Sequence, residues 1–340
     1  MPSSHTRWWA AGALVTVGVL GLWFLIGPES TRASPEIWKF EWPNTDFSKR
    51  SIAFEEILSG GPPKDGIPSI DDPEFVSAHG EVELGPREPV IALTLNGDMR
   101  AYPLRILIWH EIVNDVVGGV PVAVTYCPLC NSAIVFDRRV GGRVLEFGTT
   151  GKLRFSDLVM YDRQTESWWQ QFLGEAIVGE LTGTRLKMLP VRVESFQRFK
   201  ARALEAKVMG AKVQVPNRPG MRAYGRNPYV SYDSMSQPFL YRGTYEGEIA
   251  PLAYVVAIGD RAWALDLLRE RGRIEADDLV LTWEAGQNSA LDAPQIADGR
   301  DIGNVVVQRQ TADGLEDEVH DLTFAFVFHA FHPDGVLHVK

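Results

Sequence analysis

The hydrophobic and polar positions of this 340-residue chain follow two periodicities. Short β-branched or aliphatic runs bounded by turn residues are typical of strands, and apolar residues three and four apart are typical of helices. The first pattern predicts strands at 90–95, 120–126, 133–136, 144–147, 158–161, 176–178, 254–258, 279–283 and 322–328. The second predicts helices at 104–117, 194–206 and 262–271. The expected fold class is therefore α+β and β-rich.

Two parts of the chain resemble each other. Residues 96–104 are similar to 259–265, and 122–133 aligns with 279–290 without a gap. Internal similarity of this kind indicates repeated structural units. We therefore expect two tandem repeats, each a small mixed sheet with one packed helix.

The expected domain boundaries follow from this similarity. The first repeat would span 36–214 and would carry the Cys-Pro-Leu-Cys sequence, and the second, cysteine-free repeat would span 228–340. The segment 215–227, rich in Pro, Gly and Arg, would connect them. Residues that both repeats share are expected to maintain the fold, and residues that only one repeat has are expected to carry the function.

The N-terminal 1–35 differs from the rest of the chain. Residues 8–26 are uncharged and mostly apolar, and as a helix they would be about 28 Å long, close to the thickness of a bilayer core. Arg7 precedes this stretch, which favours a cytoplasmic N-terminus. We expect a single-pass anchor in a bacterial inner membrane, followed by a tether, with the body in the periplasm or outside the cell. The small residues around 31–33 leave a cleaved signal, and thus a secreted protein, as the alternative.

Composition and motif content exclude several function classes. The formal net charge is −10, which argues against a nucleic-acid-binding surface. Neither a dinucleotide fingerprint nor a P-loop occurs, so no nucleotide cofactor is expected. The serine-hydrolase elbow is absent as well. His110-Glu111 begins like a zinc-protease helix, but Asn114 stands where the second histidine would be needed.

The two cysteines of the chain lie in one predicted turn between two strands. Cys127 and Cys130 fall opposite Glu284 and Gln287 in the internal alignment, so only the first repeat carries thiols. A Cys-x-x-Cys turn resembles the metal knuckles of small zinc proteins. The residue after the second cysteine of such a turn often has a left-handed backbone, which Asn131 accepts at low cost.

Such a turn supplies only two ligands, and histidine is the natural source of a third. His110 is specific to the first repeat, like the cysteines, and is therefore the best partner for Cys127 and Cys130. His329 and His332 are weaker candidates, because ordinary structural roles explain them better.

Three hypotheses for the cysteines remain open at this point. They bind a transition metal, zinc or copper. Alternatively, they form a redox-active dithiol in which Cys127 attacks and Cys130 resolves, although such motifs usually open a helix. The third hypothesis is a structural disulfide in a non-catalytic module that recognises a ligand through a Trp-rich face.

A polar, glycine-punctuated stretch follows the cysteines. Ser156 and Asp157 precede a predicted strand, and Asp162 and Arg163 follow it. This density of polar and aromatic residues suits a pocket for a small-molecule or metal ligand. A structural ion pair between Asp162 and Arg163 is an equally good explanation.

Five motifs in order resemble the bacterial family called domain of unknown function 3179. They are 60–68, 100–103, 109–115, 125–130 and 156–163. The resemblance runs from about residue 50 to the C-terminus, and it implies no particular activity. It implies that the family signature includes His110, Cys127, Cys130, Ser156, Asp157, Asp162 and Arg163. It also lowers His329 and His332 as ligands, since relatives tend to have other aromatic residues there.

The sequence therefore predicts an exported, membrane-anchored protein that binds a transition metal through Cys127, Cys130 and His110. Ser156, Asp162 and Arg163 would lie in or beside the same pocket. If the protein is an enzyme, the metal or a thiolate would carry the chemistry, with His110 or Asp157 handling protons.

Overall fold

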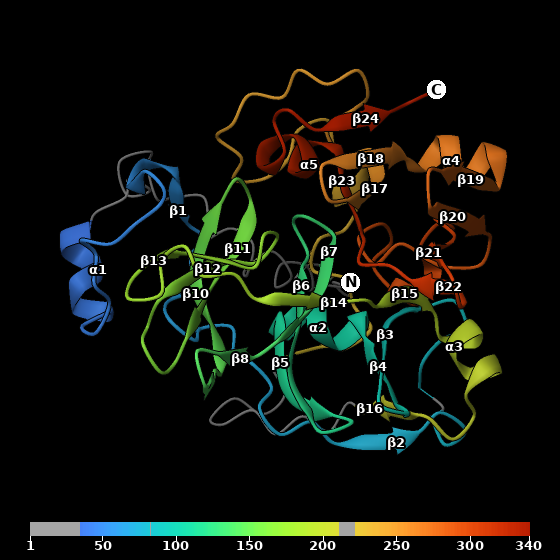
Figure 1. Cartoon of the computed structure of the whole chain (residues 1–340), viewed down its shortest axis with the longest axis horizontal. Helices are drawn as coiled ribbons and strands as arrows, with labels where there is room; N and C mark the ends of the chain where they lie inside the picture. The colour runs from blue at the N-terminus through green and yellow to red at the C-terminus, as the bar shows by residue number, and fades with distance from the viewer. Residues whose placement is uncertain (1–34, 82, 211–221) are drawn as a thin grey trace, which may run out of the picture. The chain divides into compact units, whose positions relative to one another are not determined.

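The computed structural model describes residues 35–81, 83–210 and 222–340, which belong to one compact unit. Five sheets of four or five strands form the blades of a five-bladed β-propeller (Figure 1). The predicted fold of two tandem repeats, each one sheet with one helix, is therefore wrong. The β-rich character is correct.

Blade 1 comes entirely from the first half of the chain and is antiparallel throughout. Its strands, in spatial order, are β1 (Ile57–Ser59), β10 (Phe147–Arg154), β11 (Asp157–Asp162), β12 (Trp168–Gln170) and β13 (Glu175–Val178).

Blades 2 and 3 also come from the first half. Blade 2 contains β14 (Lys187–Leu189), β7 (Ser132–Asp137), β6 (Val120–Cys127) and β5 (Ile112–Val117). Blade 3 contains β15 (Arg192–Ser195), β3 (Pro89–Leu95), β4 (Asp98–Pro103), β16 (Lys207–Met209) and β2 (Phe75–Ser77).

Blades 4 and 5 come from the second half. Blade 4 contains β23 (Asp321–Phe324), β17 (Tyr254–Ile258), β18 (Arg261–Ala264) and β24 (Val336–His338). Blade 5 contains β19 (Arg273–Ala276), β20 (Leu279–Glu284), β21 (Asn304–Thr311) and β22 (Gly314–Asp317).

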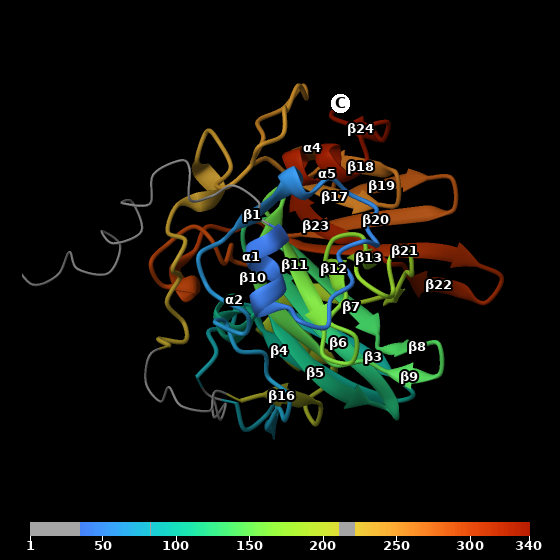
Figure 2. The same ribbon diagram turned by 90° about the vertical axis from the view of Figure 1, so that its left-hand side faces the viewer.

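The remaining elements are short and lie between or beside the blades. The helices are α1 (Pro35–Glu41), α2 (Leu104–His110), α3 (Phe196–Arg202), α4 (Leu265–Arg271) and α5 (Ala325–Phe331). Single 3₁₀ turns cover Phe54–Glu56, Tyr232–Ser234 and Ile296–Asp298, and β8 (Arg139–Val140) pairs with β9 (Arg143–Val144). Figure 2 shows the same arrangement from the side, with α4 and α5 beside blade 4.

The internal sequence similarity corresponds to a pair of blades rather than to one sheet. The order β3, β4, α2, β5, β6, β7 is matched by β17, β18, α4, β19, β20, β21. The pairing also agrees, because β16 lies parallel to β4 and β24 lies parallel to β18, while the neighbouring pairs are antiparallel. Blade 1, whose strands β10 to β13 lie between β9 and β14, has no counterpart. The boundaries 36–214 and 228–340 stay predictions, and most of the proposed connector lies outside the described residues.

The gapless alignment of 122–133 with 279–290 agrees with the structure only up to the ends of β6 and β20. β6 ends at Cys127 and β20 ends at Glu284, as the alignment requires. Ser132 then pairs with Cys127, whereas Asn304 pairs with Glu284. The second copy therefore has a much longer loop here, and Gln287 is not the structural counterpart of Cys130.

Several predicted elements change type at a sharp boundary. The predicted helix at 104–117 ends at His110, and β5 begins at Ile112. The apolar run at 322–328 is likewise a strand that ends at Phe324 and a helix that begins at Ala325. In both places the hydrophobic pattern continues across the boundary between helix and strand. The boundary cannot be located from the sequence, because short buried strands and helices are equally apolar.

The two halves are joined by hydrogen bonds between neighbouring blades. The amide of Ala133 on β7 donates to Asp321 Oδ1 on β23 at 3.0 Å, and Asn131 Nδ2 donates to the Leu322 carbonyl at 2.7 Å. In the corresponding place, the amide of Ser195 on β15 donates to Asn304 Oδ1 on β21 at 2.8 Å. The cysteine turn therefore lies where the first half meets the second.

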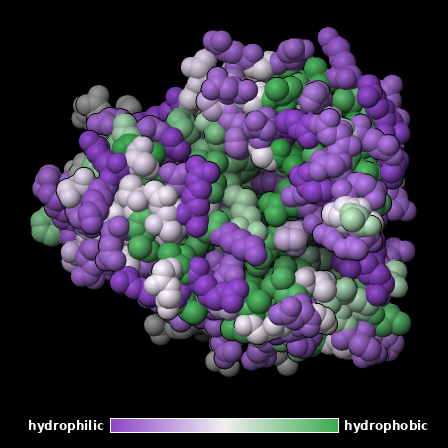
Figure 3. Space-filling model, in the orientation of Figure 1, coloured by the Kyte–Doolittle hydropathy of each residue, from purple (hydrophilic) through white to green (hydrophobic). Residues whose placement is uncertain are grey.

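Hydrophobic residues gather near the middle of the face shown in Figure 3, framed by hydrophilic ones. No helix among the described residues is long and apolar enough to cross a bilayer. The apolar stretch at 8–26 lies outside the described residues.

Candidate functional site

The cysteine turn is a short loop closed by paired strands. Cys127 is the last residue of β6, and it pairs with Ser132, the first residue of β7. Asn131 has a φ of 47°, which confirms the left-handed backbone predicted for it. Its side chain ties the turn to the second half through the Leu322 carbonyl, so the turn is held from outside as well as by its own strands.

Three potential metal ligands converge at this turn. Cys127, Cys130 and Asp157 each offer one ligand atom, and these atoms all lie within 4.8 Å of one another. All three side chains are buried, and both thiols are free. Two thiolates and a carboxylate form a donor set that suits a borderline metal ion such as zinc.

A strained turn places Asp157 against the thiols. Phe155 and Ser156 form the two-residue turn between β10 and β11, and both have positive φ, 52° and 68°. Turns of this kind usually contain Asn and Gly, because other side chains pay a conformational cost there. Asp157 begins β11 directly after this turn, and the Ser156 carbonyl lies 3.7 Å from the Cys127 sulfur.

One oxygen of Asp157 is oriented by hydrogen bonds, and the other receives none from an N–H or O–H group of the described residues. Oδ2 accepts from Gln170 Nε2 at 2.5 Å and from the Phe172 amide at 2.9 Å. Oδ1 is buried and receives no N–H or O–H donor among the described residues, and the Asp157 carboxyl also interacts with the Cys127 and Cys130 thiols. Partners that fix the outer oxygen of a carboxylate and leave the inner one free are typical of metal ligands.

The surroundings of the thiols are acidic. Burial raises the pKa of both cysteines, that of Asp157 to about 6, that of Asp321 to about 7 and that of Glu111 to about 8. Each of the three carboxyls lacks an ion pair with any Lys, Arg or His of the described chain. A group of buried acids without a cation is unfavourable by itself, and a bound metal ion would supply the missing positive charge.

His110 lies outside this group of ligand atoms. Its Nδ1 is 2.8 Å from the Pro68 carbonyl, and its Nε2 is 2.6 Å from the Tyr224 hydroxyl. Burial lowers its pKa to about 4, so the ring is neutral at physiological pH. Both nitrogens therefore have partners outside the cysteine turn, and the third potential ligand beside the two thiols is Asp157.

Ser156 lies at the edge of the site, whereas Asp162 and Arg163 lie far from the thiols. Ser156 Oγ donates to the Phe239 carbonyl at 2.5 Å. Asp162 is at the other end of β11 from Asp157, about 16 Å along an extended strand. Its carboxylate accepts from the Thr165 amide and from Trp169 Nε1, which pins the turn after β11.

Arg163 has a structural environment. Its guanidinium forms ion pairs with Asp71 at 2.8 Å and Glu146 at 3.4 Å, and it donates to Ser69 Oγ. The structure therefore does not bring Asp162 and Arg163 together with Cys127 and Cys130. Their assignment as ligand-binding residues stays a prediction.

Glu111 and Tyr229 were not among the site residues predicted from the sequence. Each shows an electrostatic coupling to Cys127, and Glu111 is also coupled to Asp157. The predicted helix at 104–117 included Glu111 as an ordinary helical residue. In the structure the helix ends at His110, and Glu111 forms the turn that follows it. Tyr229 was hidden because no motif connects the segment after 222 with the cysteines.

A segment of the second half covers the turn. Tyr232 donates through its hydroxyl to the Leu129 carbonyl at 3.0 Å and stacks on Phe239, with ring centroids 5.5 Å apart. Thr323 Oγ1 donates to the Cys130 carbonyl at 2.7 Å. These contacts fix the backbone on which the thiols are carried.

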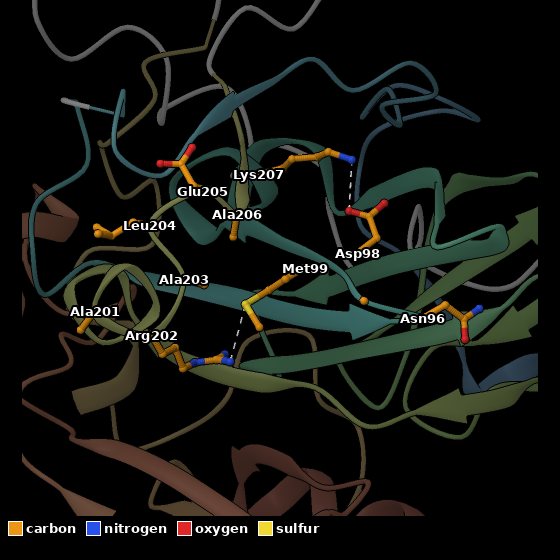
Figure 4. A pocket seen from close by; sticks show the side chains of 11 residues that line it. Asn96, Asp98, Met99, Ala201, Arg202, Ala203, Leu204, Glu205, Ala206 and Lys207 are labelled. Carbon is orange, nitrogen blue, oxygen red and sulfur yellow. Dashed lines mark hydrogen bonds and ion pairs between the residues drawn. The ribbon is translucent and has the colours of Figure 1, made fainter.

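A separate pocket lies at the edge of blade 3, between the β3–β4 turn and the α3–β16 loop (Figure 4). Three of its charged residues are paired, since Lys207 Nζ lies 3.1 Å from Asp98 Oδ1 and Arg202 contacts Glu194. None of the cysteine-site residues lines it. We assign it no role.

The model of a family described as "Protein of unknown function (DUF3179)" matches residues 64–335. This chain belongs to the DUF3179 family. The match covers every strand of blades 2, 3 and 5, all of blade 4 except β24, and the whole cysteine site, so the site lies within the part that defines the family. No curated protein and no solved structure matches this DUF3179 protein.

Proposed function

We propose that this DUF3179 protein binds one transition metal ion, with zinc as the best match, through Cys127 Sγ, Cys130 Sγ and a carboxylate oxygen of Asp157. The observation that supports this most directly is the convergence of the buried Asp157 carboxyl with both thiols. Among the described residues no N–H or O–H group donates to its Oδ1, and the carboxyl interacts with the two sulfurs instead. Burying a carboxylate oxygen without such a donor is costly unless something binds it.

The donor set favours zinc over copper within this proposal. Zinc accepts thiolate and carboxylate ligands together, whereas Cu(I) prefers sulfur alone. Three protein ligands leave a fourth tetrahedral position open, as in catalytic zinc sites and unlike structural sites with four protein ligands. We therefore propose a metal site that binds a small molecule or water, with the metal polarising it.

The redox alternative has less support from the site. A reactive dithiol needs a thiol with a lowered pKa, commonly at a helix N-terminus. Here the turn joins two strands, and burial raises the pKa of both cysteines. The short separation of the two sulfurs would still allow a disulfide, so the experiment must distinguish the two cases.

The decisive experiment is metal analysis of untagged protein purified under reducing, anaerobic conditions. We expect about one zinc ion per chain in the wild type and none in Cys127→Ser/Cys130→Ser or in Asp157→Ala. His110→Asn is the matched control, because His110 is also buried and first-copy-specific but lies outside the ligand group. It should retain the metal.

Two results would contradict the proposal. The first is wild-type protein without stoichiometric metal. The second is a cysteine pair that titrates reversibly with a mid-range reduction potential, which would favour the dithiol. Loss of metal in His110→Asn alone would restore histidine as a ligand in place of Asp157.

We further propose that the site acts outside the cytoplasm, on the strength of the apolar stretch at 8–26 and the preceding Arg7. Fractionation of cells that express the full chain tests this. Membrane-associated protein that is accessible to protease in spheroplasts is the expected result, and protein in the cytoplasmic fraction would contradict it.

A further inference from the structure

Glu111 has a backbone conformation that favours glycine. It follows α2 directly, with φ 62° and ψ −33°. Residues with a Cβ atom rarely adopt positive φ, and those that do must be held there by their surroundings. Such residues gather at functional sites, which makes Glu111 a feature that needs an explanation.

The second copy of the blade pair has glycine at the same place. Gly272 follows α4 directly, with φ 68° and ψ −31°. Its amide donates to the Leu268 carbonyl at 2.8 Å, as the amide of Glu111 donates to the Leu107 carbonyl at 2.7 Å. The two positions are therefore structural equivalents (α2 and α4 in Figure 1).

The carbonyl groups confirm the equivalence. The Glu111 carbonyl accepts from the amide of Tyr126 on β6 at 2.8 Å, and the Gly272 carbonyl accepts from Trp283 on β20 at 2.9 Å. The turn from helix to strand thus forms without any side chain at this position. The side chain of Glu111 is not needed for the fold, yet it stands where glycine would be least strained.

The carboxyl group of Glu111 has no hydrogen-bond or ion-pair partner in the part of the chain that the structure describes. The residue is nevertheless only 9% exposed. Burial raises the pKa of Glu111 to about 8, and the negative charge of Asp157 adds to this rise. Glu111 is not one of the three groups that converge within 4.8 Å. Its carbonyl accepts from the amide of Tyr126, the residue before Cys127, so its backbone lies beside the strand end that carries the thiol.

We propose that Glu111 exchanges a proton with the water or other protic ligand that binds at the open metal position. This rests on the metal site proposed above. In the forward direction the O–H bond of the ligand breaks, the proton bonds to a carboxylate oxygen of Glu111, and the electron pair stays on the ligand oxygen, which becomes a nucleophile. The return of the proton to a leaving group closes the cycle. This sequence corresponds to metal-assisted hydrolysis.

The test uses the full-length protein with cobalt(II) in place of zinc, because cobalt has a visible spectrum that reports on its ligands. We compare wild type, Glu111→Gln and Glu111→Asp across pH. All three should bind equal amounts of cobalt. The midpoint of the spectral change should move by at least about one pH unit in Glu111→Gln and return toward wild type in Glu111→Asp.

The outcomes separate this inference from the proposed function. A wild type that binds no cobalt and no zinc contradicts the metal site itself. A Glu111→Gln variant that binds cobalt with an unchanged midpoint overturns the role of Glu111 and leaves the metal site in place. Loss of cobalt in Glu111→Gln would make Glu111 a ligand instead of a proton acceptor.

Glu111→Gly provides a second readout that does not depend on the spectrum. If the glutamate is kept for chemistry at the expense of backbone strain, glycine should raise the melting temperature of the metal-free protein by about 2 °C or more. A lower melting temperature would show that the side chain contributes to the fold, which contradicts this inference.

Discussion

The two pairs of blades, 2 with 3 and 5 with 4, share one topology except for the extra edge strand β2 of blade 3, and they differ in chemistry. In the first pair, strand β6 ends at a buried thiol that faces Asp157. In the second pair, strand β20 ends at Glu284, whose side chain is exposed and forms an ion pair with Arg198. The first copy has Glu111 after its helix, and the second has glycine. The second copy therefore shows what the scaffold requires, and the differences identify what the first copy adds.

The largest difference between the copies should be the response to metal removal. We assume that zinc binds only at the first copy and that free zinc is present at about 1,000 times its dissociation constant. Removing this zinc with a chelator should then lower the free energy of unfolding of the wild type by roughly 4 kcal/mol. Thermal unfolding with and without a chelator measures this change.

Cys127→Ser/Cys130→Ser is the first comparison for that experiment, and its melting temperature should be insensitive to the chelator. Glu284→Gln, at the matching strand end of the second copy, should respond like wild type. An equal response of the cysteine variant and the wild type would contradict the assignment of the metal to the first copy.

The second prediction concerns pH. Burial raises the pKa of Asp157 to about 6 and that of Glu111 to about 8, whereas both would titrate near 4 in the unfolded chain. The folded metal-free protein therefore holds more protons than the unfolded chain between about pH 4 and pH 8. Its free energy of unfolding should fall as pH rises through this window, by on the order of 3 kcal/mol for the Asp157 carboxyl alone.

Urea denaturation of the metal-free protein at about pH 5 and about pH 8 measures this slope. Asp157→Asn/Glu111→Gln should make the slope shallower without abolishing it, because the two amides do not titrate whereas Asp321, whose pKa is raised by burial to about 7, still does. Zinc should reverse the trend, since its ligands bind in their ionised form. A variant with the same slope as wild type would show that other groups cause the pH dependence.

The elements that the sequence predicted well are those whose pattern is local. The strand that ends at the cysteines and the left-handed backbone of Asn131 follow from a run of β-branched residues and from turn chemistry. The number of blades does not follow from any local pattern. It depends on blade 1, whose strands have no repeat partner in the sequence, and on pairings such as β23 with β17, which join residues distant along the chain.

The candidate site was predicted in part, for the same reason. Cys127 and Cys130 share a turn, so their proximity can be read from spacing. Asp157 joins them through the strained Phe155-Ser156 turn, and no local pattern places this turn beside the thiols. Glu111 was hidden by a hydrophobic periodicity that continues across the end of α2, where one residue with positive φ ends the helix.

The third prediction tests how the second half holds the cysteine turn. Thr323 Oγ1 donates to the Cys130 carbonyl, and both residues are buried. Thr323→Val keeps the shape and leaves that carbonyl without its donor, which should cost about 1–3 kcal/mol of unfolding free energy. The same variant should bind zinc more weakly, because the backbone that carries Cys130 is less well fixed.

Thr94→Val is the control for this change, since Thr94 is an exposed strand residue of blade 3. It should alter stability by less than about 0.5 kcal/mol. If the two variants unfold alike and bind zinc equally, the contact from the second half does not support the site.

The smallest predicted effect measures the backbone strain itself. A Cβ atom added at Gly272 would meet no atom within 4 Å, so Gly272→Ala should cost only the conformational penalty of positive φ, about 1 kcal/mol. Gly210→Ala is the control, because its φ is outside the left-handed region and its Cβ would meet only one atom, at 3.8 Å. If Glu111→Gly raises the free energy of unfolding by about as much as Gly272→Ala lowers it, the same backbone strain exists in both copies. Only the first copy then retains a side chain at this position. If Glu111→Gly also destabilises, Glu111 belongs to the scaffold, and the comparison between the copies no longer identifies it as a functional residue.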